Sequence, residues 1–150
     1  MLAIIGGDPN RFRPYVDLYH RAFAQFGRPV HEIGVHSHGY VAETDDQARE
    51  ELWPDYKTMR DRIGAERGWP PMTRTQFDSE IEHGSLYVGA PETVAKALLA
   101  YYKLGATSLL IRGYEPLEDA VQYGDELIPI VRALVAESDA QQHAPDQTPY

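Results

Sequence analysis

The sequence contains no cysteine, which excludes disulfides, thiolate nucleophiles and zinc–thiolate sites. Basic residues are also scarce, because 14 Lys and Arg stand against 23 Asp and Glu and leave a formal net charge of -9. Binding to a phosphate backbone needs clustered positive charge, so we expect no nucleic-acid partner. No apolar run approaches the roughly 20 residues that a membrane-spanning helix requires, so we expect no membrane partner either.

The first residues, MLAIIGGDP, lack the basic region and the long apolar core of a secretory signal, so we expect a cytoplasmic protein. The chain has 150 residues, of which 43% are hydrophobic and 25% charged, and these values suit one globular domain with a single core. From residue 137 the chain turns polar and ends in DAQQHAPDQTPY. We predict one domain over residues 1–136 and a disordered tail over residues 137–150.

The most informative segment is LYVGAPETVAKALLAYYKLGATSLLIRGYEPLEDA, residues 86–120. Pro91 suits the first turn of a helix, and Gly105 is the residue type that ends one. Residues 107–111 then form a short apolar run, which predicts a strand buried on both faces of a parallel sheet. Arg112 and Tyr114 follow the carboxyl end of that strand, where α/β folds usually carry their chemistry.

Two further strands are expected earlier in the chain. The apolar run at residues 2–5 precedes the tight turn Gly6-Gly7, and residues 32–43, EIGVHSHGYVAE, form the second strand. Side chains alternate between the two faces of a strand, so His36 and His38 share one face with Tyr40. Their imidazole rings can accept or donate a proton near pH 7.

Apolar residues at spacings of three and four predict the helices between these strands. Residues 44–63 should form one helix, and residues 76–81 only a single helical turn. The last helix is expected over residues 116–135, bent at Pro129. The expected buried stripes are Phe12, Tyr15, Val16, Tyr19, Ala22, Phe23 and Phe26 in the first helix, and Leu117, Val121, Leu127, Ile130, Val131 and Leu134 in the last.

Strands that alternate with helices predict an α/β fold with a parallel sheet. A closed eight-stranded barrel takes about 250 residues, so the chain is too short to form one. The chain up to about residue 136 resembles the carboxyl-terminal half of the luciferase-like flavin-dependent monooxygenases. Within it, residues 2–82, which contain LAIIGGDPNRF and GVHSHGYVAETDDQAREELWPDY, are similar to a branch of probable flavin oxidoreductases. GAPETVAKALLAYYKLG and LLIRGYEPLEDA resemble the alkanesulfonate monooxygenase branch of that family. The resemblance implies a partial (β/α)8 TIM barrel, formed by its carboxyl-terminal strands and helices.

The resemblance also implies reduced FMN as the cofactor, with the deazaflavin F420 as the alternative, and molecular oxygen with a small organic substrate. His38 keeps the family's residue type and is the expected catalytic residue, with His36 and Tyr114 beside it. His36 stands where the sulfonate branch has Arg, which argues against an anionic sulfonate substrate. Gly6, Gly7 and Arg112 are the expected cofactor-binding residues.

Each of these sites has a structural alternative. His36 and His38 could be packed lining residues or, at their i, i+2 spacing, metal ligands, although no carboxylate lies at a matching strand position. Arg112 could pair with Glu115 or Glu118, and Tyr114 could pack on the last helix. The residues 89–93 could cradle a phosphate or simply begin a helix.

Three functions therefore compete. The first is a flavin-dependent monooxygenase, present here as a truncated chain. The second is a non-catalytic barrel fragment that binds flavin or dimerises, since open sheet edges favour self-association and hence a homo-oligomer. The third is an α/β domain that binds a small molecule unrelated to flavin, for which Gly6-Gly7-Asp8 makes a poor phosphate loop.

Overall fold

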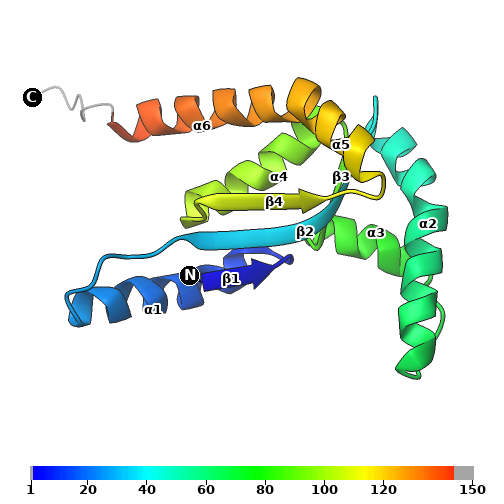
Figure 1. Ribbon diagram of the computed structural model, residues 1–150, viewed down its shortest axis with the longest axis horizontal. Helices are drawn as coiled ribbons and strands as arrows, with labels where there is room; N and C mark the ends of the chain where they lie inside the picture. The colour runs from blue at the N-terminus through cyan, green and yellow to red at the C-terminus, as the bar shows by residue number, and fades with distance from the viewer. Residues whose placement is uncertain (1, 144–150) are drawn as a thin grey trace, which may run out of the picture.

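The computed structural model describes residues 2–143 and shows strands that alternate with helices (Figure 1). The elements are β1 (Leu2–Ile5), α1 (Pro9–Gln25), β2 (Ile33–Val41), α2 (Asp45–Glu66), α3 (Arg74–Glu82), β3 (Leu86–Gly89), α4 (Pro91–Leu104), β4 (Ser108–Arg112), α5 (Pro116–Gln122), the π-helical segment η1 (Tyr123–Leu127) and α6 (Ile128–His143).

The strands form one parallel sheet with β2 at its centre. Ile4 of β1 lies opposite Val35, and Leu110 of β4 lies opposite His36. β3 pairs with the second half of β2, from His38 to Val41. The predicted α/β class and the parallel arrangement of the three strands are therefore confirmed.

The hydrogen bonds assign each strand to an edge of β2. Gly6 in the turn after β1 donates to the His36 carbonyl, and the amide of Ala42 donates to the carbonyl of Gly89, the last residue of β3. Both bonds use even-numbered residues of β2 or its extension, whereas Thr107 before β4 donates to the odd-numbered Ile33. Successive backbone groups of a strand point to opposite edges. β1 and β3 thus lie end to end along one edge of β2, and β4 lies along the other.

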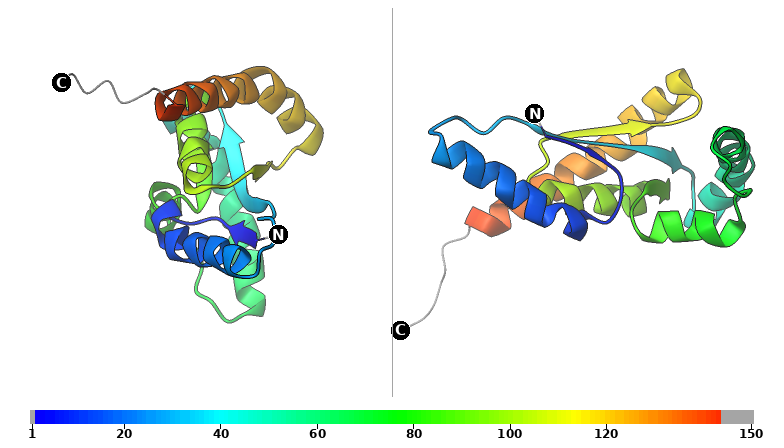
Figure 2. Two further views of the ribbon diagram at one scale, coloured as in Figure 1. Left: turned by 90° about the vertical axis from the view of Figure 1, so that its left-hand side faces the viewer. Right: turned by 90° about the horizontal axis from the view of Figure 1, so that it is seen from below.

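Among the described residues, helices cover only one face of this sheet. Odd-numbered residues of β2 are buried, and they pack with Val16 of α1 and with α4 in one core cluster. The right-hand view of Figure 2 shows α1 and α4 on one side of the strands. The even-numbered residues of β2 are only partly buried, and they form what we call the open face.

Three expectations about burial are wrong. β4 is not buried on both faces, because Leu110 is 60% exposed and no other described strand pairs with its second edge. In α5, Leu117 and Val121 are 80% and 58% exposed, since no described element packs over them. In α1 the expected stripe is only partly buried: its exposed members are Tyr15 and Phe26, and Val16 alone is fully buried.

The last helix is interrupted rather than simply bent. Ile128 donates its amide to the carbonyl of Tyr123, five residues back, and the π-helical turn ends just before Pro129. A proline cannot donate to the carbonyl four residues earlier and crowds it, which accounts for the irregular turn at this point. The Tyr123 hydroxyl donates a hydrogen bond of 3.2 Å to the buried carbonyl of Gly39, and this contact holds the turn against β2.

α6 continues to His143, beyond the expected start of the tail at residue 137. The tail prediction is therefore wrong for residues 137–143, while residues 144–150 lie outside the described part. The Tyr102 hydroxyl of α4 donates to the Asp139 carboxylate at 2.8 Å, and Gln141 donates to Glu137 within the helix. These contacts stabilise the polar last turns that composition alone assigned to a tail.

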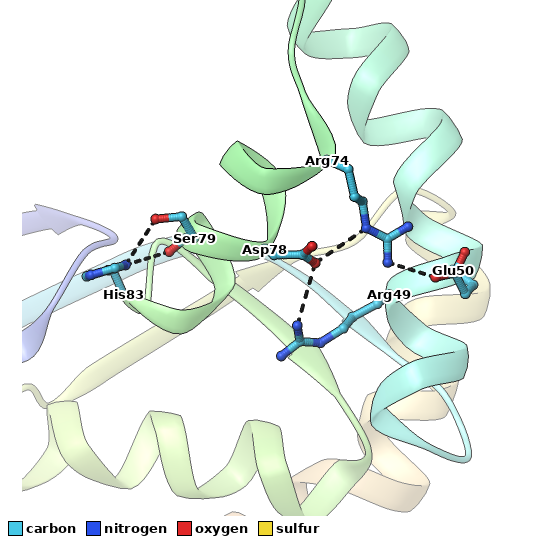
Figure 3. A network of polar contacts seen from close by, with 6 residues as sticks. All are labelled: Arg49, Glu50, Arg74, Asp78, Ser79 and His83. Atoms are coloured by element: carbon cyan, nitrogen blue, oxygen red, sulfur yellow. Dashed lines mark hydrogen bonds and ion pairs between the residues drawn. The ribbon is translucent and has the colours of Figure 1, made fainter.

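Ion pairs join α3 to α2 (Figure 3). Arg74 contacts Glu50 at 2.8 Å and Asp78 at 3.4 Å, and Arg49 contacts Asp78 at 3.5 Å. Thr73 caps α3 with a full capping box to Gln76, so this helix has nine residues instead of the single turn that we expected. α2 and α3 thus form a second small core, around Phe77, at the carboxyl end of β2.

Candidate functional site

The open face is arranged in rows by the register of the strands. Ile5, His36 and Leu110 lie side by side in one row, and His38 lies beside Arg112 in the next row toward the carboxyl ends. Side chains in register on neighbouring strands point to the same face. The row of Ile5, His36 and Leu110 is therefore apolar except for one imidazole. The next row toward the carboxyl ends carries the His38 imidazole and the Arg112 guanidinium.

His38 has the environment of a neutral histidine. Burial, then the charges of Arg112 and His36, lower the pKa of His38 from its ordinary value of 6.5. Its Nδ1 atom is buried and has no hydrogen-bond partner among the described residues. The ring lies 6.2 Å from that of His36, centroid to centroid. At neutral pH His38 can thus accept a proton from, or donate a hydrogen bond to, a bound molecule.

Tyr114 supports His38 with its ring rather than its hydroxyl. The two rings lie 5.8 Å apart with an interplanar angle of 31°. The Tyr114 hydroxyl lies 3.9 Å from the Met59 sulfur of α2, so the ring packs against the α2–α3 core and not on the last helix. Burial raises the pKa of Tyr114 to about 12, so its hydroxyl keeps its proton at neutral pH.

Arg112 is exposed at the carboxyl end of β4 and is not engaged by either predicted partner. Within residues 2–143, neither Glu115 nor Glu118 forms an ion pair with it. Glu115 instead donates its backbone amide to Asp119 at 2.8 Å. The guanidinium is therefore available to an anionic group.

Gly6 and Gly7 form the turn after β1, but their amides are already used. Gly6 donates to His36 and Gly7 to Gly84, each at 3.0 Å, and the Gly7 carbonyl accepts from the Tyr101 hydroxyl. Gly6 has a φ of 47°, and a Cβ there would lie 3.1 Å from the Ser85 carbonyl oxygen. Glycine is thus required by the backbone here, and a role in cofactor binding, which stays a prediction, would rest on close approach rather than on these donors.

The start of α4 is filled by a carboxylate from the protein itself. Asp45 accepts from the Ala90 amide at 2.7 Å and from the Thr93 hydroxyl at 3.1 Å. This contact favours the structural alternative for residues 89–93 over a phosphate site. The sequence does not predict this contact, because it joins residues 45 positions apart and leaves no local pattern.

Tyr40 and Glu51 were not among the expected site residues, although Tyr40 lies on the same face of β2 as His36 and His38. The Tyr40 hydroxyl donates to the Glu51 carboxylate at 3.1 Å, and Gln47 donates to the same group. Burial and Glu51 raise the pKa of Tyr40. The alternation that found His36 and His38 contained the signal for Tyr40, but nothing local identified its partner.

A groove of about 830 Å³ runs along the free edge of β4. On the strand side it is lined by His36, Leu110 and Arg112, and on the helix side by Asp119, Leu127 and Val131. Its lining is mainly apolar, and its charged residues are Arg112, Asp119 and Arg132. The groove thus continues from the open face around the edge of the sheet.

Two negative findings apply to residues 2–143. No group of three or more His, Asp or Glu side chains in this part could hold a metal ion, so His36 and His38 have no third ligand there. No helix in the same range combines the length and the apolar character that a membrane span requires.

The family model for the luciferase-like monooxygenases matches residues 1–108. The chain belongs to this family. No curated protein matches it. Among solved structures, monooxygenase RslO1 from Streptomyces bottropensis is 20% identical with a TM-score of 0.62, and the match covers 86% of this chain and 40% of that one.

Two other solved structures have a fold similar to that of this chain at low sequence identity. The oxygenating constituent of 3,6-diketocamphane monooxygenase from Pseudomonas putida, in complex with FMN, is 16% identical with a TM-score of 0.55, and the match covers 86% of this chain and 42% of that one. The F420-dependent tetrahydromethanopterin reductase from Methanopyrus kandleri is 18% identical with a TM-score of 0.56. This match covers 85% of the present chain and 44% of the reductase.

These matches show that the fold is a partial luciferase-like TIM barrel. The luciferase-like chain described here spans about two fifths of the length of the three structures named. The open face corresponds to the interior of such a barrel, because the helices of a TIM barrel form its outer ring.

Proposed function

We propose that the chain provides part of a flavin-dependent monooxygenase that uses reduced FMN and molecular oxygen on a small organic substrate. The observation that carries this proposal is that His38 and Arg112 lie side by side at the carboxyl ends of adjacent strands. Within residues 2–143 the buried Nδ1 atom of His38 has no hydrogen-bond partner and Arg112 forms no ion pair. Family membership supports the class of reaction. The substrate is proposed only as small, organic and lacking a sulfonate.

The residues of the open face fit a flavin. Arg112 would contact the anionic phosphate, and the apolar row with Ile5 and Leu110 would contact the ring system. A flavin supplies the redox chemistry when bound, and the protein contributes orientation, proton transfer and exclusion of water. In this site His38 holds or moves a proton through Nδ1, and Tyr114 fixes the plane of the imidazole.

His36 is proposed to shape the pocket rather than to transfer protons. It lies between Ile5 and Leu110 in the apolar row, so a flavin ring on that row would contact hydrocarbon on both sides of the imidazole. FMN is proposed over F420 because the chain resembles oxygen-using branches. The similar folds include one solved with FMN and one named for F420, so both cofactors belong in the test.

A fluorescence titration of the chain with FMN and with F420 tests cofactor binding. We expect saturable binding of FMN, weakened roughly 10- to 100-fold in Arg112→Ala, since a hydrogen bond to a charged group contributes about 1.5–3 kcal/mol. Arg13→Ala is the matched control, because Arg13 is an exposed arginine on α1, away from the open face. Absence of saturable binding of either cofactor would contradict the proposal.

The second candidate is a non-catalytic fragment that binds flavin or self-associates. The exposure of Ile5, 83%, and of Leu110 favours it, because exposed apolar residues at an open sheet favour association. Binding of FMN without turnover would favour this candidate over the monooxygenase. We also propose a cytoplasmic protein and a homo-oligomer for the isolated chain, and light scattering against the 16.9 kDa monomer tests the latter.

A further inference from the structure

The turn between β4 and α5 is closed by the side chain of Asp119 (Figure 1). The Glu115 amide donates to the Asp119 carboxylate at 2.8 Å, and the Asp119 amide donates to the Glu115 carbonyl, also at 2.8 Å. Two hydrogen bonds that run in opposite directions between the same two residues restrict their relative orientation, much as a capping box does. Asp119 thus holds the residue that comes directly before α5.

Gly113 leaves the space that this carboxylate occupies. A Cβ at Gly113 would overlap the Asp119 carboxylate and would lie 2.9 Å from the Asp119 Cβ. Gly113 has no positive φ, so glycine is needed here for space and not for an unusual backbone conformation. The Asp119 side chain therefore packs directly over the backbone of the turn, as well as bonding to Glu115.

Tyr114 lies between these two contacts and has little else to hold its backbone. The pairing of β2 with β4 ends where His38 lies opposite Arg112, so Tyr114 comes two residues after the last paired residue. The far end of its side chain has only the weak contact of 3.9 Å with the Met59 sulfur. The closed turn thus determines where the Tyr114 ring lies.

The place of the Tyr114 ring affects the surroundings of His38. The two rings lie 5.8 Å apart, and burial is the largest cause of the lowered pKa of His38. If the Tyr114 ring moved away, water would reach the imidazole, and the pKa of His38 would rise toward its ordinary value of 6.5. The charges of Arg112 and His36, which also lower this pKa, would remain.

We infer that Asp119 is a positioning residue, which closes the turn over Gly113 so that the Tyr114 ring packs against His38. This inference rests on the proposed function, because proton transfer by His38 belongs to that proposal. Asp119 acts through Tyr114, and the position requires a hydrogen-bond acceptor rather than a negative charge. An asparagine keeps a side-chain acceptor for the Glu115 amide, whereas an alanine does not.

The test follows the His38 imidazole by NMR in the full chain without flavin. Asp119→Ala should remove the contacts between the ring protons of His38 and Tyr114 and raise the pKa of His38 toward 6.5, whereas Asp119→Asn should keep both close to wild type. Glu118→Ala is the matched control, since Glu118 is an exposed carboxylate of the same helix and forms no ion pair within residues 2–143. An unchanged His38 in Asp119→Ala, or an equal change in Glu118→Ala, would overturn the inference.

A double-variant cycle tests whether Asp119 acts through Tyr114. Tyr114→Ala should raise the pKa of His38 as Asp119→Ala does, and the double variant should show no further rise. Tyr114→Phe keeps the ring and should leave the pKa of His38 unchanged. A further rise on adding Asp119→Ala to Tyr114→Ala would show that Asp119 acts on His38 directly, and it would overturn the positioning role.

Gly113→Ala disrupts the same turn by a second route, because it keeps the carboxylate but removes its space. It should reproduce the loss of contacts between the His38 and Tyr114 rings. Circular dichroism checks that each variant is folded, so the inference stays testable even where Asp119→Ala does not fold. Ring contacts that persist in a folded Gly113→Ala variant would overturn it.

None of these measurements involves a flavin. Loss of the ring contacts in Asp119→Ala, in a chain that binds no flavin, would refute the proposed function and leave the role of Asp119 intact. Flavin binding by the chain, together with an unchanged His38 in Asp119→Ala, would do the reverse.

Discussion

The two faces of the sheet differ in how they are covered: helices pack on one face, whereas the other is left open among the described residues. On the helix-covered face, Val35 and its odd-numbered neighbours are buried by α1 and α4, and Ser37 donates to the Ser85 carbonyl. On the open face, His38 has an unpaired nitrogen and Arg112 an unpaired guanidinium among the described residues. The covered face therefore accounts for the stability of the chain, whereas the open face keeps polar groups available for a ligand.

The sharpest test of this contrast compares two adjacent residues of β2. In any preparation that turns substrate over, His38→Ala should lower kcat by about 10²- to 10⁴-fold, the usual contribution of a positioned acid or base. Ser37→Ala, on the opposite face, should change stability more than kcat. Steady-state kinetics with circular dichroism separates the two effects, and an unchanged kcat in His38→Ala would remove this residue from the mechanism.

A matched pair of leucines compares the faces by stability. Leu98 of α4 is 3% exposed and Leu110 is 60% exposed. Leu98→Ala should lower the free energy of unfolding by about 2–5 kcal/mol, because it leaves a cavity in the core. Leu110→Ala should change it by less than about 0.5 kcal/mol. Chemical denaturation measures both, and similar losses would mean that the open face is packed in solution.

A smaller effect is expected where the protein supplies its own anion. Asp45→Ala removes the carboxylate from the start of α4 and should lower the free energy of unfolding by about 0.5–2 kcal/mol. Asp46→Ala is the control, since Asp46 is exposed and forms no ion pair within residues 2–143. Thermal denaturation measures both variants. Equal losses of stability would contradict the role of Asp45 at the start of α4.

The smallest effect is a pH dependence from His38. Its pKa lies below 6.5 in the folded protein, so the unfolded chain binds this proton more readily. The free energy of unfolding should therefore fall as the pH drops from about 6.5 toward the folded pKa, and His38→Ala should remove that part of the slope. Arg112→Gln should raise the pKa of His38. An NMR titration of the His38 imidazole in the wild-type chain and in Arg112→Gln checks both shifts. A wild-type pKa of His38 at or above 6.5 would contradict the account.

Local patterns predicted much of this fold. The alternation in residues 32–43 gave the two faces of β2 correctly, and Gly105, which has a φ of 111°, ends α4 as expected. The same patterns could not show whether an apolar run has neighbours on both sides. β4 and α5 are apolar in sequence, yet Leu110 and Leu117 are exposed because no described element covers them.

The candidate site was predictable to a similar degree. Strand alternation placed His36 and His38 together, and the end of β4 supplied Arg112 beside them. The sequence did not show that the Tyr114 hydroxyl turns toward Met59, or that Glu51 holds Tyr40. Those contacts join α2 to the sheet across many residues, and no local spacing records them.

The central claim is that the open face binds the flavin. An NMR titration with FMN, following the backbone signals of β2, β4, α1 and α4 and the imidazole signals of β2, tests it most directly. We predict shifts that are concentrated at His36, His38 and Arg112 and are small at Val35 and Leu98. Shifts concentrated on α1 and α4, or no shifts at saturating FMN, would contradict the claim.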